Sequence, residues 1–254
     1  MATALVGGLC SEGWAPSEIL VLEPNKMQRD HLLRTYGVHA LEKADASVSH
    51  ANAVVWAVKP QSMNDAASEV APLTRDALHI SIAAGVTVAQ LRTMLGVDRI
   101  VRSMPNLPAV VRAGVTGLFA PATLSSEDRS VAERILGTAG QTFWVPEESR
   151  MNAVTAVSGS GPGYVFHFLE GFQQAAEEMD FTADQARSLV LQVVQGALDI
   201  ARNESSTFEE LRSRVSSKGG TTAAGTLQLD LAETQKALIA AVRAAYDRGV
   251  ELGT

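Results

Sequence analysis

Short apolar runs recur along the first 145 residues, and several of them lack the polar alternation of a half-exposed strand. Such runs are typical of strands that are covered on both faces. They occupy residues 19–22, 54–58, 78–82, 99–101, 114–119 and 142–145. Helical stretches separate them, among them 25–36 and 126–138. The alternation predicts a doubly wound, Rossmann-like α/β domain with a parallel sheet at residues 1–146.

Beyond Pro146 the apolar positions follow the helical period instead. One stripe runs from Val165 to Met179 and another from Ala186 to Ala201. The segments that open at Thr182 and Ser206 both match the capping box, and an alanine-rich run closes the chain at 237–252. We therefore predict an all-helical domain at residues 147–254. Its apolar faces form either the core of that domain or a contact between subunits.

Composition narrows the class of protein. Of 254 residues 46% are hydrophobic and 19% charged, which predicts a globular protein with a real core. The net charge of −7 and the lack of basic runs disfavour nucleic acid or a membrane as partner and favour a small molecule. The single cysteine, Cys10, fits a reducing compartment and so a cytoplasmic location. The five histidines have no metal-ligand spacing, so we expect no metal site.

Small residues and prolines follow three of the predicted strands. Lys59-Pro60 come after the run at 54–58, Ala83-Ala84-Gly85 after 78–82, and 102–108 after 99–101. In an open α/β sheet, ligands bind beyond the carboxyl ends of the strands. These loops would leave room for a flat ring, although each is also ordinary turn chemistry.

Two further segments combine glycine with hydroxyl side chains, at 158–164 and 216–225. The second directly precedes a helix-forming run. Glycines let the backbone approach a ligand, and the free N–H groups and positive dipole end of a helix start favour an anion. The alternative is an ordinary capped loop.

Taken together and in this order, five motifs closely resemble those of the Δ1-pyrroline-5-carboxylate reductase family. They are AVKP at 57–60, AAGV at 83–86, RSMPNLPA at 102–109, AVTAVSGSGPGY at 153–164 and VSSKGGTTAAGTL at 215–227. The last two are the specific ones. The resemblance implies reduction of pyrroline-5-carboxylate to L-proline with NAD(P)H, the last step of proline biosynthesis. It also implies a Rossmann domain followed by a helical domain that forms a homodimer or a higher homo-oligomer.

The resemblance also implies roles for individual residues. Thr222 is expected at the imine nitrogen as the catalytic residue, while Gly219, Gly220 and Thr221 would offer backbone donors to the substrate carboxylate. Glu148 matches an acidic residue near the substrate, although an exposed loop glutamate is an equal alternative. The positions that match the cofactor lining are Ala57, Val58, Lys59, Pro60, Ala83 and Ala84.

The choice between NADPH and NADH depends on the end of the run at 19–22. Glu23 stands where an acidic side chain would accept from the ribose 2′-OH of NAD and repel a 2′-phosphate. Asn25, Lys26 and Arg29 follow and could instead receive that phosphate, or all four could form a solvated helix start. On the resemblance alone we expect NADPH, with Asn25 among the cofactor contacts.

The chain also departs from the family pattern. Met1-Ala2 match the end of the motif, roughly GGGNMA, with which relatives begin, so the first strand and the phosphate-binding glycines are missing from the sequence and we expect residues ahead of Met1. Leu107, Lys218 and Thr226 replace residues usual in relatives. Two other hypotheses therefore stay open: a catalytically impaired or inactive homologue that dimerises, and a reductase of another small imino or hydroxy acid.

Overall fold

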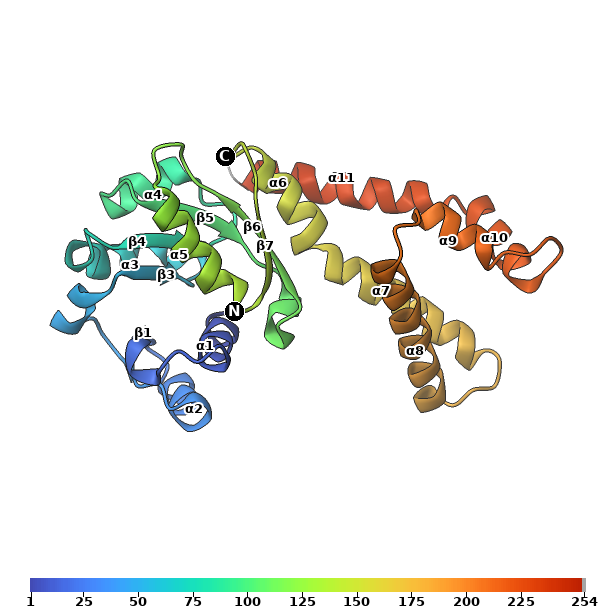
Figure 1. Ribbon diagram of the computed structural model, residues 1–254, viewed down its shortest axis with the longest axis horizontal. Helices are drawn as coiled ribbons and strands as arrows, with labels where there is room; N and C mark the ends of the chain where they lie inside the picture. Colours follow the sequence, from blue (N-terminus) through green and yellow to red (C-terminus); the bar gives the residue numbers. More distant parts are fainter. Residues whose placement is uncertain (253–254) are drawn as a thin grey trace. The chain divides into compact units, whose positions relative to one another are not determined.

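The computed structural model describes residues 1–252 and divides into two compact units (Figure 1). The first comprises Met1–Pro162 together with the chain from Ala245 onward, and the second comprises Gly163–Ala244. Each unit has a different architecture. The first contains all the described strands, and the second is helical.

The first unit is built on a five-stranded sheet in the order β3-β4-β5-β6-β7. The strands are β3 Ala53–Trp56, β4 Leu78–Ser81, β5 Ile100–Met104, β6 Gly114–Phe119 and β7 Gly140–Trp144. All neighbours are parallel except β5 and β6, which are antiparallel. The prediction of a parallel sheet is wrong at this point. The connection at 105–113 is shorter than the dozen or so residues that a parallel crossover needs, so the chain can only turn back.

A separate two-stranded parallel sheet holds β1 Val21–Leu22 and β2 Ala40–Leu41. Among the described strands, β1 pairs only with β2, and β3 pairs only with β4. Figure 1 shows β1, in blue, apart from the strands of the larger sheet. In a doubly wound sheet the order 3-2-1-4 places one further strand between these two edges. The sheet is therefore divided at the place where the family pattern has its first strand.

Helices cover both faces of the larger sheet. Those of this unit are α1 Ala2–Ser11, α2 Lys26–Tyr36, α3 Met63–Val70, α4 Val88–Leu95, α5 Ser126–Gly137 and α6 Arg150–Val154. Side-chain caps from Asn25, Thr87 and Ser125 open α2, α4 and α5. A π-helical turn at Thr155–Gly159 joins α6 to α7 (Gly161–Glu177).

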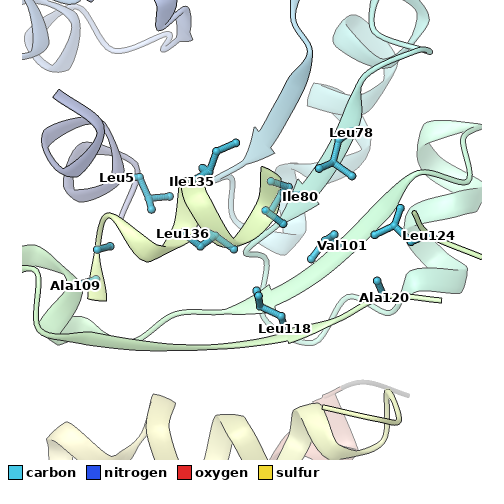
Figure 2. Close-up of a cluster of buried hydrophobic side chains, with 12 residues drawn as sticks. Leu5, Leu78, Ile80, Val101, Ala109, Leu118, Ala120, Leu124, Ile135 and Leu136 are labelled. Carbon is cyan, nitrogen blue, oxygen red and sulfur yellow. The ribbon is translucent and has the colours of Figure 1, made fainter. Parts of the chain in front are cut away.

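The two faces of the sheet carry separate apolar clusters. On one face Ile80, Val101 and Leu118 meet Leu5 of α1 and Ile135 of α5 (Figure 2). The other face is covered by α3 and α4, whose buried side chains are Met63, Ala67, Val70, Val88, Leu91 and Leu95. Alternate strand residues serve opposite faces, which explains why the sequence runs lacked polar alternation.

His79 is a fully buried polar residue on the face of the sheet that α3 and α4 cover. Its Nδ1 accepts a hydrogen bond from Trp56 Nε1 at 3.0 Å, and its Nε2 lies 2.9 Å from the carbonyl oxygen of Thr74. An indole N–H can only donate, so Nδ1 carries no proton and Nε2–H donates to Thr74. Burial, opposed by the bond to Thr74, lowers the pKa of His79 below its ordinary value of about 6.5.

The second unit contains α8 Ala183–Asn203, α9 Phe208–Arg214, α10 Thr221–Leu231 and most of α7 and α11 (Thr234–Leu252). The capping box of α8 is formed by Thr182 and Gln185, as predicted. That of α9 is formed by Thr207 and Glu210, one residue later than predicted, because Thr207 Oγ1 accepts from the N–H of Glu210 and Glu210 Oε2 accepts from the N–H of Thr207. No described helix of the chain is long and apolar enough to cross a membrane.

The apolar stripes of the second unit lie on helices, as predicted, but most of their side chains are exposed. Among its described residues, the buried hydrophobic ones are Ala186 and Val190. Phe168 is 54% exposed, Phe172 38% and Val193 55%. A soluble monomer rarely exposes so much apolar surface. The exposure therefore favours the subunit contact over an internal core.

We expect the stability of the chain to fall as the pH drops below about 6.5, in part because of His79. The pKa of His79 is lower in the folded chain than in the unfolded chain, so below that pH the unfolded chain binds more protons. Each pKa unit between the two states changes the free energy of unfolding by up to about 1.4 kcal/mol. In denaturant titrations, the free energy of unfolding should fall less between pH 8 and pH 5.5 in His79→Gln than in the unchanged chain. The exposed His50→Gln is the control, and equal losses in all three would contradict the assignment.

We also expect folding to be coupled to self-association. Thermal unfolding should shift upward by about 1–2 °C for each tenfold rise in protein concentration. Val193→Glu, which places a charge in the α8 stripe, should abolish the shift and give a monomer in sedimentation velocity. Gln192→Glu, at a neighbouring exposed position of the same helix, should change neither. A monomeric unchanged chain whose melting temperature is independent of concentration would disprove the coupling.

Candidate functional site

Six of the seven predicted cofactor residues gather at one edge of the larger sheet. Ala57, Val58 and Lys59 follow β3, and Pro60 opens a 3-10 turn. Ala83 and Ala84 follow β4, where the N–H of Ala83 donates to Ser81 Oγ at 3.2 Å. Because β3 and β4 are parallel neighbours, their carboxyl ends and these two loops lie side by side.

Asn25 lies elsewhere, in the turn that follows β1 of the two-stranded sheet. It is the N-cap of α2, and its Oδ1 accepts from the N–H of Met27 at 2.9 Å. One acceptor of this predicted cofactor residue is therefore used by the helix, while its amide nitrogen can still donate.

Glu148 is held inside the first unit by two hydrogen bonds to the same oxygen. Its Oε1 accepts from the N–H of Val88 at 2.7 Å and from Arg102 Nη1 at 2.9 Å. The Arg102 side chain is 8% exposed and that of Glu148 is 28% exposed. Val88 is the first residue of α4, so the carboxylate also lies at the positive end of that helix. Glu148 is thus a partly buried ion-pair partner rather than a solvated loop residue.

Arg102 is a residue that the sequence reasoning missed. It belongs to the RSMPN motif, but the predicted strand stopped at residue 101, whereas β5 continues to Met104. The available signal was a charged residue that directly follows an apolar strand run. A buried arginine requires an acidic partner, and Glu148 supplies it from 46 residues away.

Asn106 joins two of the motifs. Its Oδ1 accepts from the N–H of Val115 at 2.9 Å, and its Nδ2 donates to the carbonyl oxygen of Ser158 at 3.0 Å. Ser158 lies in the π-helical turn between α6 and α7. A Cβ on the adjacent Gly159 would come within 3.0 Å of Met104 Cε, so the turn lies directly against the end of β5. The RSMPN and SGSGPG segments are therefore parts of one structure, and π-helical turns are frequent at functional sites.

The segment 216–225 forms a tight turn followed by a helix, as predicted. Gly219 has a φ of +75°, and the N–H of Gly220 donates to the carbonyl oxygen of Ser217 at 2.9 Å. A Cβ on Gly220 would lie 2.5 Å from Ser217 Oγ and 3.1 Å from the carbonyl oxygen of Ser217, so a larger residue would turn the Ser217 hydroxyl away and press on the backbone of the turn. Helix α10 then begins at Thr221.

The start of α10 has donors available for an anion. Gly220 is its N-cap and, among the described residues, no side chain caps this terminus. Thr221 and Thr222 are both exposed in the first turn. The hydroxyl of Thr226 donates to the carbonyl oxygen of Thr222 at 3.0 Å, so this departure from the family pattern is accommodated within the helix. Amide and hydroxyl groups of this kind can bind a carboxylate.

Among residues 1–252, no group of three or more histidine, cysteine, aspartate or glutamate side chains could hold a metal ion.

The chain resembles known proteins over its whole length. It is 38% identical to the pyrroline-5-carboxylate reductase of Haemophilus influenzae, over all of this chain and 94% of that protein. The chain belongs to the pyrroline-5-carboxylate reductase family. Residues 148–252 match the family profile described as pyrroline-5-carboxylate reductase dimerisation, and residues 1–85 match that described as NADP oxidoreductase coenzyme F420-dependent.

Two solved structures of pyrroline-5-carboxylate reductases have the same fold as this chain. The Coxiella burnetii pyrroline-5-carboxylate reductase superposes with a TM-score of 0.92 at 35% identity, over all of this chain and 95% of that one. The Plasmodium falciparum pyrroline carboxylate reductase, solved with NADP bound, gives 0.88 at 25% identity, over 99% and 94% of the two chains. The prediction of a Rossmann-like domain followed by a helical dimerisation domain is confirmed.

The ion pair of Glu148 can be tested separately from any contact with substrate. Glu148→Gln should lower the free energy of unfolding by roughly 3–5 kcal/mol, because the buried Arg102 loses its counter-charge. The double variant Arg102→Met with Glu148→Gln should recover part of that loss. Urea titrations provide the measurement, with the exposed neighbour Glu147→Gln as control. A Glu148→Gln variant as stable as this control, but inactive, would instead support the predicted substrate role.

Proposed function

We propose that this chain reduces Δ1-pyrroline-5-carboxylate to L-proline with NAD(P)H, the last step of proline biosynthesis. The observation that carries the proposal is the Gly219-Gly220 turn at the start of α10, which offers donors for a carboxylate. The full-length similarity to the Haemophilus influenzae pyrroline-5-carboxylate reductase supports the same substrate.

The residues of this turn suit the proposed substrate, which is a small ring with one carboxylate and one C=N bond. The backbone N–H groups of Gly219 and Thr221 would bind the carboxylate, and that of Gly220 would join them by leaving its bond to the carbonyl oxygen of Ser217. The hydroxyl of Thr222 would accept a hydrogen bond from the protonated imine nitrogen and keep that proton in place. Because the carbon of the C=N bond is itself electrophilic, no nucleophilic side chain is required, and catalysis consists mainly of orientation.

Bound NAD(P)H supplies the hydride that this carbon accepts. The loops after β3 and β4 fit a nicotinamide cofactor, because Ala57, Ala83 and Ala84 present small side chains at the carboxyl edge of the sheet. We assign cofactor contacts to these residues and to Val58, Lys59, Pro60 and Asn25. Asn106 and Arg102 hold the neighbouring loops in position.

A homodimer or higher oligomer formed through the helical unit completes the proposal. The matched dimerisation profile and the exposed apolar stripes both support it. We place the boundary between the cofactor-binding domain and the helical domain at residues 146/147. The acidic net charge argues against a nucleic-acid or membrane partner, and the single cysteine suits a cytoplasmic enzyme.

The full chain should oxidise NADPH or NADH when pyrroline-5-carboxylate is added, as followed by the loss of absorbance of the reduced cofactor. Six-membered cyclic imines and 3-hydroxy acids serve as the competing substrates. The rate should be highest with pyrroline-5-carboxylate. No turnover with any of them would favour the inactive homologue, and a preference for another acid would favour the third hypothesis.

Thr222→Ala should lower kcat/KM for pyrroline-5-carboxylate by about ten- to a hundredfold, since a hydrogen bond to a charged group contributes about 1.5–3 kcal/mol. Thr222→Ser should retain most of the activity. Thr226→Ala, which removes a hydroxyl bonded within α10, is the matched control and should behave like the unchanged chain. Undiminished turnover in Thr222→Ala would refute the role of this residue.

A further inference from the structure

The end of β1 presents a carboxylate at the edge of the smaller sheet. The N–H of Glu23 donates to the carbonyl oxygen of Leu41 at 2.9 Å, so the residue extends the pairing of β1 with β2. Its Oε1 accepts from the N–H of Asn25 at 2.8 Å. The side chain is partly buried and its position is set by this bond. A carboxylate has more acceptor sites than one N–H occupies, so Glu23 can accept further hydrogen bonds.

The nearest arginine is already engaged. Arg29 Nη1 donates to the carbonyl oxygens of Glu23 and Pro24 at 2.8 and 2.7 Å, and its Nη2 forms an ion pair with Glu42 at 2.9 Å. Its side chain is 18% exposed. Arg29 therefore fastens the turn between β1 and α2, and Glu42 balances its charge. Three of its five N–H donors are therefore committed, which leaves only Nε–H and one hydrogen of Nη2 for a phosphate.

The remaining cation of this turn is weakly placed for the same task. Lys26 is 78% exposed and pairs with Asp30, one helical turn away. Across Glu23, Lys26, Arg29, Asp30 and Glu42 there are two positive and three negative charges, a net charge of −1. Arg34, whose charge also acts on Asp30, brings this sum to zero, so a doubly charged 2′-phosphate at this edge would meet no excess of positive charge.

We propose that Glu23 is a specificity-determining residue that makes this chain bind NADH more tightly than NADPH. This inference rests on the proposed function and goes against the NADPH preference that the family resemblance implies. At the end of this strand of a dinucleotide-binding fold, an acidic side chain accepts from the ribose 2′-OH. The structure adds that the bond from the N–H of Asn25 holds Glu23 in place to accept from the ribose. Arg29, the residue best suited to a phosphate, already binds Glu42 and two backbone carbonyl oxygens.

Direct binding to the full chain tests the proposal without turnover. Dissociation constants for NADH and NADPH are measured by the fluorescence of the reduced nicotinamide, and displacement of bound NADH is measured with 5′-AMP and 2′-AMP. NADH should bind at least tenfold more tightly than NADPH. Glu23→Gln, which can keep the bond from the N–H of Asn25, should reduce this ratio by about tenfold, chiefly by strengthening NADPH binding.

A second variant and a control separate the parts of the argument. Glu42→Gln removes the charge that balances Arg29 and should strengthen NADPH binding severalfold while leaving NADH binding unchanged. Glu18→Gln is the control, because Glu18 also accepts from a backbone N–H, that of Ala15 at 2.8 Å, but follows a different turn. It should alter neither constant.

The outcomes distinguish this inference from the proposed function. If pyrroline-5-carboxylate is reduced but NADPH binds more tightly than NADH, or Glu23→Gln leaves the ratio unchanged, the role of Glu23 is refuted and the reductase stands. If the unchanged chain binds neither cofactor, the reductase proposal fails and the inference fails with it.

Discussion

A single oxygen of Glu148 accepts hydrogen bonds from Arg102 and from the N–H of Val88, and the arrangement of the carboxyl edge of the sheet depends on it. Arg102 belongs to the central strand β5, and Val88 begins the helix that follows the Ala83-Ala84 loop. A charge as deeply buried as that of Arg102 cannot persist without its partner. The segment around Glu148 is therefore fixed to the sheet just before α6 begins.

The next contact along the same segment is made by Asn106, which binds the carbonyl oxygen of Ser158 in the π-helical turn. The segment from 148 to 158 is therefore bonded to the region around β5 at both ends, at Glu148 through Arg102 and at Ser158 through Asn106. The end of β5, the start of α4 and the chain from 148 to 158 are thus linked by partly buried hydrogen bonds. This rigidity is what a site needs when its chemistry consists of orienting a flat cofactor and a small ring.

Local chemistry explains which features could be predicted from the sequence. The turn at Gly219-Gly220 and the cap at Thr182 depend on residues a few positions apart, so their patterns are visible in the chain. The antiparallel pairing of β5 with β6 was missed because it follows from the length of the connection rather than from any residue type. Arg102 and Asn106 were missed because their partners lie far away in the sequence, and the burial of the helical stripes depends on a surface outside one chain.

The cofactor end of the first unit shows how structure changes an interpretation. As a sequence, Glu23, Asn25, Lys26 and Arg29 allowed either ribose or phosphate recognition. The hydrogen bonds of Arg29 to two carbonyl groups and to Glu42 leave the carboxylate of Glu23 as the dominant charge for a cofactor to meet. Membership of the family fixes the type of reaction, and this local network is what adapts it to one form of the cofactor.

The central claim is that the chain transfers hydride to the C=N carbon of pyrroline-5-carboxylate. The most direct measurement uses reduced cofactor carrying deuterium at the transferable position, with the product examined by NMR and mass spectrometry. The account predicts L-proline with one deuterium, on the ring carbon next to nitrogen that does not bear the carboxylate. Proline without deuterium from either face of the labelled nicotinamide, or no proline at all, would contradict it.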